Sequence, residues 1–71
     1  KMTDKVLIHV RFNNDGSVLE IAERPASLTP QQWFAKLTEK AGNAFQALTG
    51  GRGVFRVTAD EIASYKATAL Q

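Results

Sequence analysis

The hydrophobic residues between positions 28 and 48 recur at three- and four-residue steps, the spacing of one face of an α-helix. The members of this stripe are Phe34, Leu37, Ala41, Phe45 and Leu48, with Trp33 and Ala44 beside them. Thr29 is a favoured N-cap, Pro30 fits the first helical position, and Gln32 completes a capping box. The pattern therefore predicts one amphipathic helix of about five turns from Leu28 to Leu48.

Gly42 and Asn43 weaken the middle of this predicted helix. A glycine inside a helix costs about 1 kcal/mol relative to alanine, and asparagine is also a poor helix former. We favour a small residue that is tolerated on a crowded helix face. The alternative is a helix that kinks or ends at Gly42 and restarts beyond it. Gly50 and Gly51, which follow the stripe, favour a left-handed stop.

Apolar and polar residues alternate between Lys5 and Phe12, which is the pattern of a strand with one apolar face. We expect that face to hold Val6, Ile8, Val10 and Phe12. A second alternating run extends from Val18 to Arg24, with Leu19 and Ile21 on the inward side. Pro25 ends this second strand because proline has no backbone donor for the sheet.

The residues between the two runs predict a hairpin. Asp15-Gly16 is a favoured pair for a two-residue type I′ turn. Such a turn fixes the register, and a slip by one residue would turn the apolar side of the second run to the wrong face. The expected cross-strand pairs are Phe12 with Leu19, Val10 with Ile21, and Arg11 with Glu20. A four-residue loop, which would place Glu20 opposite His9, is the alternative.

The last part of the chain predicts a short strand and a second helix. The strand extends from Val54 to Val57. Thr58 is the expected N-cap of the helix, and Glu61 completes its capping box. The apolar stripe of this helix consists of Ile62, Tyr65, Ala69 and Leu70.

The predicted order of elements is strand, strand, helix, strand, helix, which places the chain in the α+β class (ββαβα). This order resembles the beginning of ubiquitin-like β-grasp domains. The resemblance concerns topology alone, a later strand of the usual β-grasp sheet is missing, and function does not follow from fold. If the third strand pairs beside the first, a right-handed crossover makes those two strands parallel.

The length of 71 residues predicts one domain, which we place at residues 2–71. We interpret Met2 as the natural start and Lys1 as a residue left by cloning. The chain has no cysteine, which excludes disulfides and thiolate chemistry and fits a reducing compartment. No apolar run approaches the roughly 18 residues of a membrane span. We therefore expect a cytoplasmic protein that does not contact a membrane.

The formal net charge is +2, and basic and acidic residues are interspersed along the sequence. Dedicated nucleic-acid-binding proteins usually show clustered basic residues. The charge pattern therefore favours a mixed solvated surface, and it favours protein over nucleic acid as the expected partner.

No residue set predicts catalysis or metal binding. His9 is the only histidine, so a transition-metal site would need carboxylates for all its other ligands. No serine–aspartate set with recognisable spacing accompanies it. The segment 49–53 has three glycines around Arg52, but it lacks the lysine and the following helix of a phosphate-binding loop. We expect no enzyme activity, metal or cofactor, and we keep Arg52 as a loop candidate for binding.

The outward side of the predicted hairpin is the first candidate for a binding surface. Leu7 and Val18 are expected there beside polar and charged residues, and this mixture favours contact with a partner. The residues that we assign to partner binding are Leu7, His9, Arg11, Val18 and Arg24. The alternative is that the second helix folds over this side and makes it part of the core.

These observations favour a small non-catalytic protein-interaction module. We expect a regulatory or accessory protein that binds a larger protein, or its own copy in a homodimer. Small phage and mobile-element proteins are similar in size and composition. The alternative is a nucleic-acid-binding protein that uses dispersed arginines on the outer sheet face, drawn from Arg11, Arg24, Arg52 and Arg56.

Overall fold

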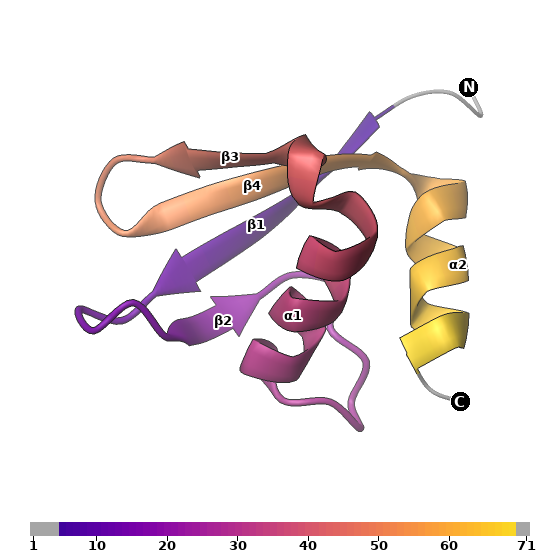
Figure 1. The fold of residues 1–71 in the computed structure, drawn as a ribbon, viewed down its shortest axis with the longest axis horizontal. Coiled ribbons are helices and arrows are strands. Elements are labelled where there is room, and N and C mark those ends of the chain that lie inside the picture. Colours follow the sequence, from indigo (N-terminus) through magenta and orange to yellow (C-terminus); the bar gives the residue numbers. More distant parts are fainter. Residues whose placement is uncertain (1–4, 70–71) are drawn as a thin grey trace.

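Four antiparallel strands form one sheet, and two helices pack against one face of it (Figure 1). The computed structural model describes residues 5–69, so the predictions for Lys1, Met2 and Leu70 lie outside the described residues. The elements are β1 (Lys5–Phe12), β2 (Val18–Ile21), α1 (Pro30–Ala41), the 3-10 turn η1 (Gly42–Ala44), β3 (Phe45–Leu48), β4 (Arg52–Thr58) and α2 (Ala59–Ala69). The strand order is β2-β1-β4-β3, so β1 and β4 are central and β2 and β3 are the edges.

The apolar face of β1 is confirmed as the centre of the core. Ile8 and Val10 are almost completely buried, and Val6 and Phe12 pack against them with partial exposure. We call this side of the sheet the inner face and the opposite side the outer face. Successive side chains along a strand point to opposite faces, so the residues before and after each buried residue in the sequence belong to the outer face.

The loop of the hairpin between β1 and β2 is one residue longer than predicted. The pairs Val10–Ile21 and Arg11–Glu20 are confirmed, but Phe12 pairs with Val18 because a β-bulge shifts the register beyond Arg11. Leu19 is therefore 52% exposed and Val18 only 8% exposed, the reverse of the predicted orientation.

The connecting turn explains the shift. The Asn13 N–H donates to the Ser17 carbonyl at 2.8 Å, and the Gly16 N–H donates to the Asn13 carbonyl at 2.9 Å. Gly16 has a φ of 91°, the left-handed conformation that closes a three-residue hairpin loop. The two-residue turn at Asp15-Gly16 is therefore wrong, although the glycine has the expected role of supplying a positive φ.

The beginning of α1 matches the prediction. The Thr29 hydroxyl accepts the Gln32 N–H at 3.1 Å, and the Gln32 side chain accepts the Thr29 N–H at 2.8 Å, which completes the capping box. Trp33 and Leu37 are fully buried against the sheet. The indole N–H of Trp33 donates to the Ala22 carbonyl at 3.1 Å, so its polar atom is satisfied as well.

The single helix from Leu28 to Leu48 is wrong in its second part. α1 ends at Ala41, the chain makes the 3-10 turn η1, and residues 45–48 form strand β3. Gly50 and Gly51, with φ values of 76° and 70°, turn the chain from β3 into β4. The helical spacing of Phe45 is therefore coincidental, but the prediction that Phe45 packs into the core is confirmed because its ring lies on the inner face.

This additional strand changes the element order and the sheet topology. The order is ββαββα, and β4 lies antiparallel to β1 because a hairpin, and not a single crossover, returns the chain from α1. The expected parallel pairing is therefore wrong. The prediction of an α+β domain is confirmed, with a four-stranded antiparallel sheet and two helices.

The position of α2 decides whether the outer face is covered. Its capping box is confirmed, since Glu61 accepts the Thr58 N–H at 2.7 Å and Thr58 accepts the Glu61 N–H at 3.1 Å. Ile62 is buried in the same core cluster as Leu37 of α1. The second helix therefore packs on the inner face beside α1, and the alternative in which it covers the outer face is wrong.

No helix within residues 5–69 has the length and apolar character to cross a membrane.

Candidate binding surface

No helix covers the outer face of the sheet within residues 5–69 (Figure 1). Strand alternation assigns side chains from all four strands to it. Its members are Lys5, Leu7, His9 and Arg11 on β1, Glu20 on β2, Gln46 and Leu48 on β3, and Arg52, Val54, Arg56 and Thr58 on β4. The sheet thus brings together residues that are dispersed along the sequence.

The aliphatic part of the outer face spans β1, β4 and β3. Leu7 is 41% exposed and Leu48 is 38% exposed. Val54 lies between His9 and Gln46 on the neighbouring strands and is only 3% exposed. An apolar centre surrounded by polar and charged groups is the arrangement found in protein–protein interfaces.

Two arginines occupy opposed positions on neighbouring strands of the outer face. Arg11 on β1 is directly opposite Arg52 on β4, and like charges at opposed positions destabilise a sheet. The only described carboxylate on this face belongs to Glu20, whose oxygen lies 3.8 Å from Arg11 in an exposed ion pair. Such pairs contribute little in water. The face therefore has an excess of positive charge that an anionic group would relieve.

Hydrogen bonds hold two of these arginines over the β3 side of the sheet. A guanidinium nitrogen of Arg56 donates to the Gln46 side chain at 3.0 Å. The Nε of Arg52 donates to the Thr49 carbonyl at 3.3 Å. Arg52 is the first residue of β4 and belongs to the outer face, so it lies in a strand and not in the predicted loop, and its role in binding stays a prediction.

The outer face includes some of the residues predicted for partner binding and excludes others. Leu7, His9 and Arg11 lie on it as predicted. The outward placement of Val18 is wrong, because the bulge turns this residue into the core. Arg24 lies beyond β2, where Glu23 has a φ of 64°, and its guanidinium donates to the Leu28 carbonyl. It therefore does not lie on the outer face.

Sequence reasoning missed two residues of this surface. The sequence pattern predicts a helical position for Gln46 and Leu48, whereas both lie on β3. The signal was present in the two glycines between two short runs, which is a hairpin pattern. The regular apolar spacing outweighed that signal.

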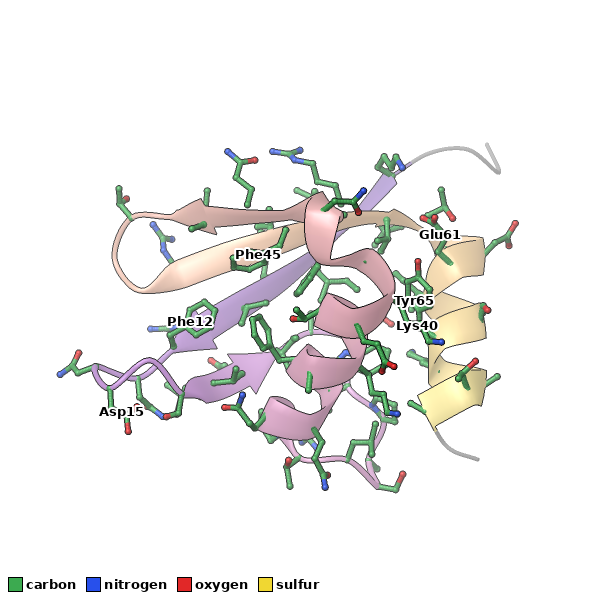
Figure 2. All side chains as sticks on the ribbon, in the orientation of Figure 1. Phe12, Asp15, Lys40, Phe45, Glu61 and Tyr65 are labelled. Atoms are coloured by element: carbon green, nitrogen blue, oxygen red, sulfur yellow. The ribbon has the colours of Figure 1, made fainter. Side chains whose placement is uncertain are left out.

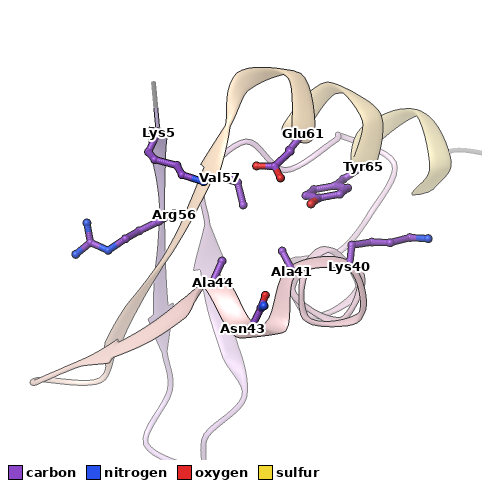
Figure 3. A pocket seen from close by; sticks show the side chains of 9 residues that line it. All are labelled: Lys5, Lys40, Ala41, Asn43, Ala44, Arg56, Val57, Glu61 and Tyr65. Carbon is purple, nitrogen blue, oxygen red and sulfur yellow. The ribbon is translucent and has the colours of Figure 1, made fainter. Parts of the chain in front are cut away.

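A cavity of about 350 Å³ between the end of α1, η1, β4 and α2 is the second candidate (Figure 3). The side chains of Glu61 and Tyr65 project toward its centre, whereas the charged ends of Lys40 and Arg56 lie away from it. The Glu61 carboxylate caps α2, and the N–H of Thr58 that it accepts lowers its pKa. Burial raises the pKa of Tyr65. Lys5 also lines the cavity, and its positive charge contributes to the lowered pKa of Glu61, so the charged groups that meet there are this one lysine and one glutamate.

The outer face carries groups that can contact charged and apolar parts of another molecule. Among residues 5–69, no three potential metal ligands come together. The outer face offers guanidinium donors, one imidazole and aliphatic side chains. These groups suit the recognition of carboxylates or phosphates beside an apolar contact.

Comparisons with protein-family models, curated proteins and solved structures find no match to this chain. Its function is therefore inferred from its residues and their arrangement.

Proposed function

We propose that this chain is a small non-catalytic protein-interaction module, a regulatory or accessory protein that binds an acidic surface of a larger protein through its outer sheet face. The observation that supports the proposal is the opposition of Arg11 and Arg52 across two central strands. Two like charges in this position cost stability in the free protein. A carboxylate of a partner placed between them would convert this repulsion into two attractive contacts.

The composition of the face supports a protein partner. Leu7 and Leu48 supply exposed apolar area, and arginine is among the residues most often important at protein interfaces. Positive charge at the rim would also increase the rate of encounter with an acidic surface. A homodimer through this face is disfavoured, because it would bring the arginines of two copies together.

Nucleic acid is the second candidate, favoured by the grouping of Arg11, Arg52 and Arg56 on one face. Arginine binds phosphate well, and these are three of the four arginines that the sequence analysis names for this alternative. Proteins that bind single strands usually add aromatic side chains on which bases stack. In the described part of the chain, the phenylalanine and tryptophan side chains belong to the inner-face core. This difference favours protein over nucleic acid.

The resemblance to the β-grasp order and a cytoplasmic location stay predictions. Neither supports the proposed function, since folds host unrelated functions.

Affinity capture with matched variants tests the proposal. The wild-type protein, Leu7→Asp, Arg52→Glu and Lys40→Glu are used as bait, and captured proteins are quantified by mass spectrometry. Lys40 is exposed on α1, so Lys40→Glu makes the same charge change away from the outer face. We expect a partner that is retained by Lys40→Glu and lost by the other two variants, with binding then measured on the purified pair.

Two results would contradict the proposal. Equal capture by all four proteins would place the interaction elsewhere. Micromolar or tighter binding of an oligonucleotide at about 150 mM salt, with a steep salt dependence, would favour nucleic acid, since non-specific binding is typically about 10⁻⁴ to 10⁻⁶ M.

A further inference from the structure

The two edges of the sheet differ in how well they are protected. At the β2 edge, the Val18 N–H donates to the side chain of Gln31 at 3.0 Å. The bulge at Leu19 interrupts the ladder there, and the indole of Trp33 occupies the Ala22 carbonyl just beyond the strand. Bulges and covering groups of this kind prevent a further strand from pairing. The β2 edge is therefore blocked.

The β3 edge has none of these protections in the described structure. Gln46, Ala47 and Leu48 are all exposed, and β3 contains no proline, lysine or bulge. Phe45 fixes the start of the strand, because its ring packs on the inner face and its N–H donates to the Gly42 carbonyl. The edge is thus exposed and held in an extended conformation.

The ladder shows which backbone groups are available. The His9 carbonyl accepts the Ala22 N–H, so the backbone groups of His9 face β2. In a strand, the backbone N–H and C=O of successive residues face opposite sides, so those of Val10 face β4 and bond to its partner Gly53. Gly53 is therefore bonded toward β1 and cannot bond Ala47, its neighbour on β3. The N–H and C=O of Ala47 consequently face the open edge.

The side chains beside this edge have different chemistry on the two faces. On the outer face, the Arg56 guanidinium is bonded to Gln46 and places positive charge over β3. On the inner face, Phe45 lies 6.3 Å from Phe12 and 5.8 Å from Phe34 between ring centroids, and all three rings are partly exposed. Figure 2 shows Phe12 and Phe45 on the part of the sheet beside α1, where the helix does not overlie them.

We propose that the β3 edge accepts an extended segment of the partner as a fifth strand, with acidic residues on the outer face alternating with apolar residues on the inner face. The inference rests on the proposed function and extends it from a surface to a mode of binding. Backbone hydrogen bonds to Ala47 supply affinity, and alternation supplies specificity. Acidic side chains would approach Arg56, and apolar ones would cover Phe45 and its neighbouring rings.

A designed peptide tests this mode of binding. The probe is a short peptide of alternating glutamate and valine, and the control probe alternates lysine and valine. Backbone amide shifts and amide exchange are followed by NMR in the isotope-labelled protein. We expect the largest shift and the greatest slowing of exchange at Ala47, with the glutamate peptide binding more tightly than the lysine peptide.

Three variants separate the contributions of the Ala47 backbone donor and the Arg56 charge to peptide binding. Ala47→Pro removes the donor at the edge but leaves the β3–β4 bonds of Gln46 and Leu48, and we expect about tenfold weaker binding. Ala47→Val keeps the donor and should bind as the wild type does. Arg56→Gln should reduce the preference for the glutamate peptide. If Ala47→Pro fails to fold, the other two variants still test the donor-independent part of the proposal.

Each remaining outcome overturns the fifth-strand inference in a distinct way. Shifts confined to Leu7, His9 and Arg11 would place the peptide on the outer face, in agreement with the proposed function but not with edge pairing. No shift with either peptide would reject edge pairing, and equal shifts at Ala47 with both peptides would reject the preference for acidic residues. Both results leave the proposed function to the capture experiment. Concentration-dependent shifts at Ala47 without peptide would assign the edge to a second copy of the chain.

Discussion

Replacing Gly53 with alanine measures how tightly β3 is held against the sheet. A Cβ at position 53 would lie 2.5 Å and 2.6 Å from two ring atoms of Phe45 and 3.3 Å from the Gln46 carbonyl oxygen. These distances to the ring are shorter than any van der Waals contact, so the ring or the strand has to move. The Phe45 ring is packed against Phe12, Phe34 and Phe55, which restricts its movement.

The cost follows from this packing. Inserting a methyl group into a well-packed core typically costs about 1–3 kcal/mol, and we expect Gly53→Ala to fall in that range. For a domain of this size, each 1 kcal/mol lowers the melting temperature by about 4–8 °C. Urea unfolding followed by circular dichroism and thermal melting would measure both quantities.

A double-mutant cycle identifies the cause. Phe45→Ala removes the ring that the new methyl group would meet, so Gly53→Ala should cost much less in that background than in the wild type. An equal loss of stability from Gly53→Ala in the two backgrounds would show that the loss does not arise from contact with the Phe45 ring. A neutral or stabilising Gly53→Ala in the wild type would refute the reasoning outright.

Three further predictions concern the core, the outer face and the α2 cap. Leu37→Ala should cost about 2–5 kcal/mol in urea melts because Leu37 is fully buried; a loss near zero would contradict the packing. Leu7→Asp should leave the thermal midpoint within a few degrees, whereas unfolding would show that the outer face is core. The pKa of Glu61 is lower in the folded protein than its ordinary value of 4.5. The carboxylate therefore contributes to stability above that ordinary pKa, and the contribution is lost as pH falls through the folded pKa. Glu61→Gln should consequently show a smaller acid-induced drop in melting temperature.

Local signals in the sequence predicted the parts of the fold that depend on neighbouring residues. The capping boxes at Thr29 and Thr58 form as predicted, because each depends on a residue three positions away. The apolar face of β1 is also confirmed, since alternation over eight residues leaves one arrangement that buries it.

The errors arise where competing patterns had similar strength. Phe45 and Leu48 continue the helical spacing of α1, but Gly42 and Asn43 end the helix, and pairing with β4 stabilises an extended chain instead. A bulge of one residue at Leu19 inverts the orientation of Val18, and no residue pattern in that run indicates it. For the candidate site, position along the strand predicted Leu7, His9 and Arg11, whereas the opposition of Arg11 and Arg52 required the order of the strands.

The four phenylalanines on the inner face come from four different elements: Phe12 from β1, Phe34 from α1, Phe45 from β3 and Phe55 from β4. Because α1 ends at Ala41, these rings provide the cover that further helical turns would otherwise give this end of the sheet. Detachment of any one element would break contacts with at least two others. This half of the molecule should consequently open as a single cooperative unit. Exchange of the Gln46 and Leu48 amides, which face β4, would then be limited by the same event as exchange near the rings of β1 and β4.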